Sequence, residues 1–129
     1  MCLLESVEAW DDVTIRCLAW THRDQRNPLR FNGRLTASAG LEYAAQAMGA
    51  HVGLVDGDGP TDHRIGLIGS VRDVVFDIDR LDDLDGCLMV NATRLVVGEQ
   101  GYMYHFTLMH ELRKLIEGRA SIFIRAAAS

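Results

Sequence analysis

Cysteine and proline are scarce in this chain of 129 residues, which contains three of the first and two of the second. The cysteines, at positions 2, 17 and 87, are far apart and form no CxxC pair, which argues against a disulfide framework and a zinc site. The histidines show no metal-ligand spacing, so we expect no bound metal. No apolar run reaches the roughly 20 residues of a membrane-spanning helix, and the first residues lack the basic segment of a signal peptide. We therefore expect a cytoplasmic protein that does not span a membrane.

Positive charge is also scarce, because 13 Lys and Arg residues face 18 Asp and Glu residues, which gives a formal charge of −5 at pH 7. This balance argues against nucleic acid as the main partner. The charges are unevenly placed along the chain. Residues 22–34 hold four arginines against one aspartate, whereas residues 73–85 hold six aspartates. Each run on its own is typical of solvated surface.

Apolar residues make up 48% of the chain and charged residues 24%, as in an ordinary globular protein. The length fits one domain over residues 1–129, and no repeat or linker divides it. Residues 13–19 are rich in strand-forming types and predict a first strand. Residues 21–38 predict a long loop, and a loop of this length in a compact domain is usually functional or disordered.

The segment that follows, residues 40–55, has the periodicity of a buried helix. Its larger apolar residues recur at spacings of three and four, and most other positions are alanine or glycine. Segments rich in Val, Ile, Leu, Phe and Tyr then predict strands over residues 65–78, 87–97, 102–110 and 120–126, with turns at 85–86 and 98–101 and a break near 113–118; residues 88–93 and 102–108 also alternate in polarity. These elements predict an α+β fold in which an antiparallel sheet wraps around a long central helix. Since one sheet cannot cover every side of that helix, we also expect a dimer.

Glu42 opens this otherwise apolar helix, and a buried acid is costly unless it has a task or a partner. Gln46 lies one turn later on the same face. His51 lies about 180° around the helix from Glu42, so it is excluded as the partner of that carboxylate. His22, in the arginine-rich loop, is a histidine that folding could bring to Glu42 to make an acid/base pair.

Backbone N–H groups near residues 37–41 have no intrahelical acceptor, and the helix dipole favours negative charge there. An acyl carbonyl placed at this point could develop oxyanion character. An imidazole, a carboxylic acid and a backbone oxyanion site together suit proton abstraction next to a carbonyl, with the acid protonating a departing hydroxyl. Spacing alone leaves simpler interpretations open: Glu42 as a helix-start residue favoured by the dipole, His22 as an ordinary loop histidine, and Gln46 as a partner of buried backbone groups.

These residues resemble those of the hotdog-fold 3-hydroxyacyl-[acyl carrier protein] dehydratases. In that superfamily a loop histidine precedes a helix that begins with an acidic residue and carries a glutamine four positions later. The segment from His22 to Met48, HRDQRNPLR…GRL…GLEYAAQAM, is most similar to small bacterial dehydratase-like proteins of aryl-polyene and related polyketide-type pathways. Residues 1–4 and 80–84 also resemble that group, so the resemblance covers most of the chain.

The resemblance implies a hotdog fold and a dimer in which His22 of one chain faces Glu42 of the other. It implies dehydration of 3-hydroxyacyl thioesters to trans-2-enoyl thioesters in fatty acid or polyketide-type synthesis. The histidine takes the α-proton, the acid assists loss of the β-hydroxyl, and backbone N–H groups hold the thioester oxygen. On this basis we expect substrate-binding positions at Gln46, Ala37, Gly40 and Arg30. No cofactor is implied, because the substrate arrives on the phosphopantetheine arm of an acyl carrier protein, or on CoA.

The implied partners are an acidic acyl carrier protein, docked by the arginine-rich loop near the tunnel mouth, and a second copy or another hotdog dehydratase. The loop departs from the housekeeping dehydratases in two ways: the twenty residues from His22 to Glu42 are a longer interval, and Thr36-Ala37 replaces a Pro-Gly pair. Two further functions therefore stay open. One is a weakly active or non-catalytic subunit of a heteromeric dehydratase, and the other is a hotdog acyl thioesterase, against which the loop histidine argues.

Overall fold

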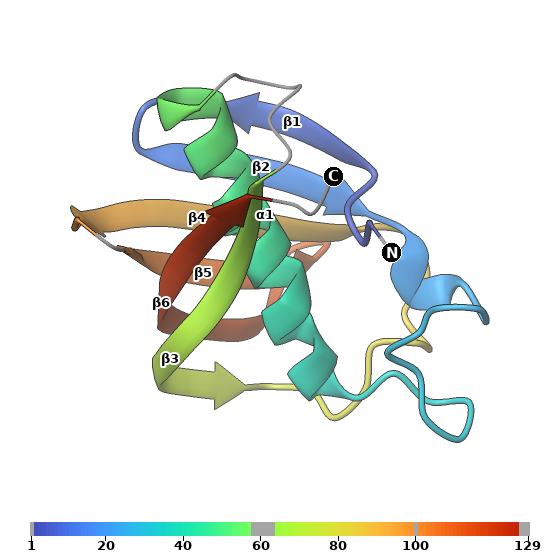
Figure 1. Cartoon of the computed structure of the whole chain (residues 1–129). Helices are drawn as coiled ribbons and strands as arrows, with labels where there is room; N and C mark the ends of the chain where they lie inside the picture. The colour runs from blue at the N-terminus through green and yellow to red at the C-terminus, as the bar shows by residue number, and fades with distance from the viewer. Residues whose placement is uncertain (1, 58–63, 100, 127–129) are drawn as a thin grey trace.

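The computed structural model describes residues 2–57, 64–99 and 101–126. In these residues one antiparallel sheet of six strands curls around one long helix (Figure 1). The strand order is β1-β2-β4-β5-β6-β3, so β1 and β3 form the two edges. The elements in chain order are β1 (Ser6–Trp10), β2 (Thr14–Ala19), η1 (Thr21–Arg23), η2 (Ala37–Ala39), α1 (Gly40–Asp56), β3 (Arg64–Phe76), β4 (Leu88–Val97), β5 (Tyr102–His110) and β6 (Arg113–Ala126). Among the described helices, α1 included, none has the length and apolarity to span a bilayer.

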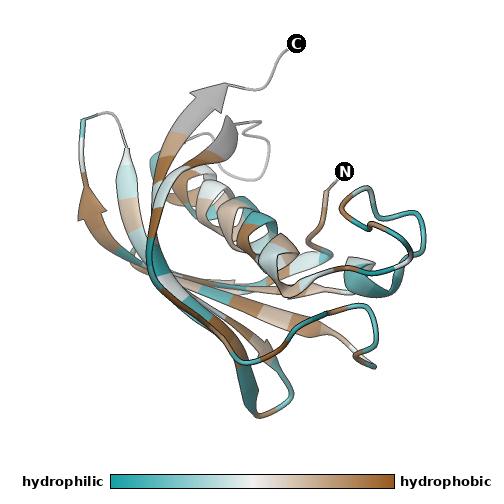
Figure 2. Cartoon of the chain, turned by 90° about the horizontal axis from the view of Figure 1, so that it is seen from below, coloured by the Kyte–Doolittle hydropathy of each residue, from teal (hydrophilic) through white to brown (hydrophobic). Residues whose placement is uncertain are grey.

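Helix α1 lies in the concave face of the sheet (Figure 2) and contacts strands β2 to β6. Met48 and Val52 are fully buried there, and each such apolar side chain contributes roughly 1.5–3 kcal/mol relative to an exposed one. The helix start packs still more closely. A Cβ atom at Gly40 would lie 2.5 Å from Cδ1 of Ile116 and 3.0 Å from Cδ2 of Leu108, so the strands approach this backbone because it has no side chain.

The inward face of the sheet supplies the rest of the core through the period-two alternation of its strands. On β4, Leu88, Val90 and Ala92 are buried while their neighbours are partly exposed. On β5 the buried positions include Phe106, which stands opposite Ala92, and Leu108, which stands opposite Val90. The predicted alternation of these two strands is therefore confirmed.

One side of α1 is not covered by its own sheet. Residues spaced by four along the helix form this uncovered stripe: Glu42 is exposed, and Gln46, Ala50 and Leu54 are half-buried. The expectation that one sheet cannot cover the whole helix is confirmed. The expectation that Glu42 is a buried acid is wrong for the single chain, because its position faces away from the sheet.

The predicted helix and four of the predicted strands match the structure closely, and two details were wrong. The strand β1 was not predicted, because it is a short edge strand whose side chains are all exposed and whose register shifts between Val7 and Ala9. The predicted break at residues 113–118 is instead the first half of β6. The turn lies just before it, at Glu111, which has a φ of 56°.

Candidate active site

His22 lies in the short η1 turn and is completely buried. Its Nε2 atom lies 3.0 Å from the carbonyl oxygen of Leu84. A carbonyl only accepts, so Nε2 carries the proton and Nδ1 presents its lone pair. Nδ1 is buried and has no hydrogen-bond partner within the described residues. A buried acceptor without a partner is costly, and such atoms are usually kept for a functional reason.

The surroundings of this imidazole keep it neutral. Burial lowers the pKa of His22, the Leu84 carbonyl partly opposes that effect, and the positive charges of Arg23, His110 and Arg30 lower the pKa further. A neutral imidazole with a fixed tautomer and an unpartnered lone pair has the properties of a general base.

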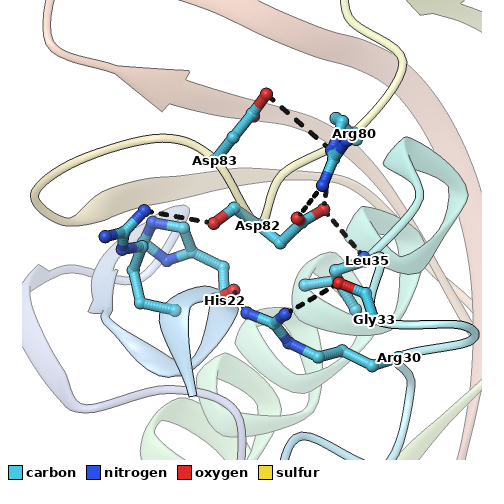
Figure 3. Close-up of polar contacts among 8 residues, drawn as sticks. His22, Arg30, Gly33, Leu35, Arg80, Asp82 and Asp83 are labelled. Atoms are coloured by element: carbon cyan, nitrogen blue, oxygen red, sulfur yellow. Dashed lines mark hydrogen bonds and ion pairs between the residues drawn. The ribbon is translucent and has the colours of Figure 1, made fainter. Parts of the chain in front are cut away.

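Arg30 braces the loop from inside. Its Nη2 donates to the carbonyl oxygen of His22 at 3.0 Å, and its Nη1 donates to that of Gly33 at 3.0 Å. Arg30 is an expected substrate-binding residue, but within one chain its guanidinium is directed at the backbone of its own loop (Figure 3). In the same loop, Arg26 is directed to solvent, with 92% of its side chain exposed, and Arg34 is also exposed.

A second brace comes from the connection between β3 and β4. Asp82, with 8% exposed, accepts the N–H of Leu35 at 2.9 Å and the Nε–H of Arg80 at 3.1 Å, and Arg80 also donates to its second carboxylate oxygen (Figure 3). The Arg80 guanidinium is the main reason that the pKa of Asp82 lies far below its usual range. Arg23 donates to the carbonyl oxygen of Asp82 at 3.2 Å.

A chain of hydroxyl groups ties the same loop to α1. The hydroxyl of Thr21 donates to the carbonyl oxygen of Leu3 at 2.7 Å and lies 2.8 Å from the hydroxyl of Tyr43. Because the one proton of Thr21 goes to Leu3, the Tyr43 hydroxyl donates to Thr21. It accepts in turn from Nδ2 of the buried Asn27 at 3.1 Å. Thr21 precedes His22 and Tyr43 follows Glu42, so this hydrogen bond connects the backbone next to His22 with the backbone next to Glu42.

The amides at the helix start are more engaged than the sequence predicted. The N–H of Ala37 donates to the carbonyl oxygen of Asp79 at 2.9 Å. The N–H of Gly40 is directed at the carbonyls of Ala37 and Ser38. The expectation that Ala37 and Gly40 offer free amides to a substrate is therefore wrong, because the η2 turn and the β3–β4 connection supply acceptors. The Ser38 N–H is the amide of this turn without an acceptor in the described part of the chain.

Glu42 and Gln46 lie on the uncovered stripe, one turn apart. The side-chain oxygen of Gln46 accepts the N–H of Leu3 at 2.7 Å, so it fixes the N-terminal segment. Glu42 is exposed while His22 is fully buried, and no hydrogen bond or ion pair joins the two within the described portion of one chain. A single chain thus holds both groups but does not bring them together.

His51 belongs to a separate cluster, as its helical position predicted. Its Nε2 lies 2.8 Å from the carbonyl oxygen of Asp11, and its Nδ1 lies 2.6 Å from the hydroxyl of Tyr104. Arg94 donates from Nε to that hydroxyl at 3.1 Å and forms an ion pair with Asp56 at 2.8 Å. This cluster joins the far end of α1 to the sheet. Over residues 2–57, 64–99 and 101–126, no group of three potential ligands could hold a metal ion.

Three residues whose hydrogen bonds hold the candidate site in place were not identified from the sequence. Asn27 appeared only as a turn signal, Tyr43 as a polar helix position, and Asp82 as part of an acidic surface run. Asn27 and Tyr43 are 16 residues apart, and Leu35 and Asp82 are 47 apart, so no local pattern identified these contacts. The neighbouring Arg80 and Asp82 gave no sign that this carboxylate is buried.

Known proteins support the fold and place the chain in a family. A chain of the dehydratase heterocomplex ApeI:P from Xenorhabdus doucetiae is 20% identical, with a TM-score of 0.76 over 95% of this chain and 82% of that chain. A hypothetical protein from Staphylococcus aureus is 13% identical, with a TM-score of 0.66 over 95% and 93%. A thioesterase from Pseudomonas aeruginosa is 15% identical, with a TM-score of 0.62 over 94% and 81%.

At these identities the likeness establishes the hotdog fold. No curated protein matches the chain significantly. The family model of ApeP-like proteins, described as ApeP dehydratase, matches residues 1–128. This chain therefore belongs to the ApeP-like family of hotdog-fold dehydratases.

Proposed function

We propose that this chain takes part in the dehydration of 3-hydroxyacyl thioesters to trans-2-enoyl thioesters, with His22 as the base. The observation that supports it most is the buried Nδ1 of His22, which has no partner in the described residues while Leu84 holds the other ring nitrogen. An imidazole kept neutral by burial can accept a proton near neutral pH. Family membership supports the same reaction class.

In the proposed step, Nδ1 of His22 removes a proton from C2 of the substrate, next to the thioester carbonyl. The C2–H electron pair forms the C2=C3 bond as the C3–O bond breaks. A carboxylic acid protonates the departing hydroxyl, which leaves as water. The imidazolium and the carboxylate then exchange a proton through solvent, so the reaction is redox-neutral and we expect no cofactor. A backbone N–H, for which Ser38 is a candidate, would hold the thioester oxygen.

The acid for this step comes, we propose, from a second hotdog chain, and Glu42 supplies the same group to the base of that chain. Glu42 is exposed on the uncovered stripe while His22 is buried in its own chain. The edge strand β3 also exposes apolar side chains at Leu67, Val71 and Val75, which a second chain would cover. The Xenorhabdus relative occurs in a heterocomplex, which favours a second, different dehydratase subunit over a homodimer.

The substrate is, in this proposal, carried on the phosphopantetheine arm of an acyl carrier protein rather than on free CoA. The loop around His22 offers exposed positive charge at Arg26 and Arg34. An acidic carrier protein would be attracted to that charge. Gln46 and Arg30, which both contact backbone groups of this chain, would then shape the site rather than bind the substrate directly.

The test supplies the purified protein, alone and with its co-purified hotdog partner, with a 3-hydroxyacyl-carrier protein and detects the enoyl product by mass spectrometry. His22→Ala and Glu42→Gln each disable one of the two shared sites, so each should leave about half of the turnover, and the double variant should lower turnover by roughly 10²–10⁴-fold, the usual contribution of acid–base groups. His105→Ala is the matched control, because that histidine lies on the outer face of the sheet and pairs with Glu117 at 2.9 Å. Full turnover in the double variant would refute the proposal.

A second candidate is a partner subunit that contributes only one half of the shared site. The separation of His22 from Glu42 in one chain favours it. In that case the chain alone gives no product, and in the complex the loss of one of the two residues, His22 or Glu42, leaves turnover unchanged, while the loss of the other lowers it as much as the double variant does. A thioesterase would instead release free thiol from acyl-CoA, which the same samples can be assayed for.

A further inference from the structure

The connection between β3 and β4 contacts two parts of the candidate active site that lie far apart in the sequence. The N–H of Leu81 donates to the carbonyl oxygen of Leu35 at 2.8 Å, just before the helix start. The carbonyl of Leu84, three residues later, holds Nε2 of His22 at 3.0 Å. A single short segment therefore sets both the backbone that leads into α1 and the orientation of the imidazole.

Asp82 is the residue through which these two contacts are joined. Its buried carboxylate accepts the N–H of Leu35 at 2.9 Å and is held on both oxygens by Arg80 (Figure 3). Its backbone carbonyl accepts from Nη1 of Arg23, the neighbour of His22, at 3.2 Å. The side chain is tied to the helix start, and the main chain is tied to the loop of the base.

We propose that Asp82 is a positioning residue for His22: the carboxylate clasped by Arg80 fixes the segment whose Leu84 carbonyl selects the tautomer of the base. This inference rests on the proposed function, in which Nδ1 of His22 takes the proton. Asp82 itself touches neither the imidazole nor the substrate in this role. It acts in the way that outer groups orient a catalytic histidine.

The physical reason is the cost of leaving buried partners unsatisfied. Without the carboxylate, the Leu35 N–H and the Arg80 guanidinium lose their acceptors, and the connection shifts to find others. Leu84 is only two residues away, so its carbonyl moves relative to Nε2 of His22. The imidazole then samples both tautomers, and part of the population no longer presents a lone pair at Nδ1.

The loss of order around His22 should also change the pH dependence of the reaction rate, because its surroundings set the pKa of the imidazole. Burial disfavours the imidazolium most, and Arg23, His110 and Arg30 disfavour it further by their positive charge, while the Leu84 carbonyl favours it. A loosened segment admits water, and the pKa of the imidazole then rises toward its usual value. The acid limb of the pH–rate profile, which reports the deprotonated base, would move to higher pH.

The experiment compares Asp82→Asn with Asp77→Asn in the full chain and its complex. Asparagine retains the Oδ1 acceptor but turns an amide N–H₂ toward Arg80. Asp77 is the matched control, because it is an exposed carboxylate of the same connection that pairs with Arg113 at 3.4 Å. Three quantities are measured: the kcat and KM of dehydration over pH, the tautomer of His22 by ¹⁵N NMR of the ring, and the urea midpoint.

In the Glu42→Gln background, where only the site that contains His22 turns over, we expect Asp82→Asn to lower kcat about 10- to 100-fold, the usual effect of slightly misplacing a catalytic group, with KM little changed. The acid limb moves to higher pH, and a second tautomer of His22 appears. Asp77→Asn changes none of these. An unchanged His22 spectrum in Asp82→Asn overturns the inference, as does a loss of kcat that follows lowered stability with the acid limb unmoved.

The NMR measurement separates this inference from the proposed function. If the wild-type complex shows no dehydration, a change of the His22 tautomer in Asp82→Asn still supports the positioning role while the proposed function fails. If Asp82→Asn is too unstable for spectra, Arg80→Lys replaces it. That variant retains the charge but not the two-pronged contact, and its result is interpreted in the same way.

Discussion

Arg30 and His22 are joined by a hydrogen bond of 3.0 Å, from Nη2 of the arginine to the backbone carbonyl oxygen of the histidine. The same guanidinium reaches Gly33 with Nη1. Arg30, which the sequence predicted to contact substrate, thus holds the backbone of His22, the proposed base, in place. The arginines of this loop therefore differ in role: Arg30 donates to backbone carbonyls of the loop, whereas Arg26 presents its charge to solvent.

Arg30→Lys should lower the kcat of the site that contains His22 about tenfold, measured in the Glu42→Gln background, since one ammonium group cannot span two carbonyls and the base loses its placement. KM should stay within about twofold. Arg26→Lys is the control and should match the wild type in kcat. Steady-state kinetics with the carrier-linked substrate decides between the two roles of Arg30. A raised KM at constant kcat would mean that Arg30 binds substrate or carrier after all.

Gly40→Ala should destabilise the protein by about 1–3 kcal/mol, the usual cost of overpacking a core. The same substitution in an exposed helix would instead stabilise a protein, because it reduces the backbone freedom of the unfolded chain. Here the added methyl meets Cδ1 of Ile116 at 2.5 Å. Urea unfolding of the variant measures the change, with Ser38→Ala, at an exposed position, as the control. A stabilised variant would show that the helix start can move away from the sheet.

Tyr104→Phe should cost about 1–3 kcal/mol, because it leaves Nδ1 of His51 buried without a donor and removes the acceptor of the Arg94 Nε–H. Burial raises the pKa of Tyr104 to about 12, so the hydroxyl remains a donor at every working pH. Tyr102→Phe is the control, since its ring stays under the Arg94 guanidinium at 4.9 Å. Equal urea midpoints for the two variants would contradict the structural role of this cluster.

Folding stability should decrease as the pH falls below 6.5. Burial lowers the pKa of His22 and of His51 below the usual 6.5; for His51 the positive charge of Arg94 adds to this, against the Asp11 carbonyl and the charges of Asp56 and Asp11. The unfolded chain therefore takes up protons first, and the stabilisation, complete above pH 6.5, is lost as the pH falls toward the folded pKa values.

Urea midpoints at pH 7.5, 6.5 and 5.5 measure this loss. His51→Gln, which retains a donor for the Asp11 carbonyl, should show a shallower dependence on pH over this range. Asp82 does not contribute to the loss in this window: its folded pKa is depressed, so its share disappears only below about pH 3.8. A slope that is the same in wild type and His51→Gln would rule out the contribution of this histidine.

Much of the fold could be predicted because its signals are local. Apolar spacings of three and four predicted α1 to within a residue. Strand-forming residues, with clear alternation in β4 and β5, predicted β3, β4, β5 and the second half of β6. The strand β1 gave no such signal, since an edge strand with both faces exposed needs no alternation. The first half of β6 was mistaken for a break because its outward positions, including Arg113, Lys114 and Glu117, are charged.

The sequence by itself determined the candidate pair of His22 and Glu42, the exclusion of His51, and the resemblance to hotdog dehydratases, because these depend on residue type and spacing along one chain. The tertiary structure decided which polar groups are already used. His22 and Leu84 are 62 residues apart, and Leu35 and Asp82 are 47 apart. Contacts over such separations follow from how the β3–β4 connection crosses the helix start, and hydrogen-bond satisfaction is known only once both partners are placed in space.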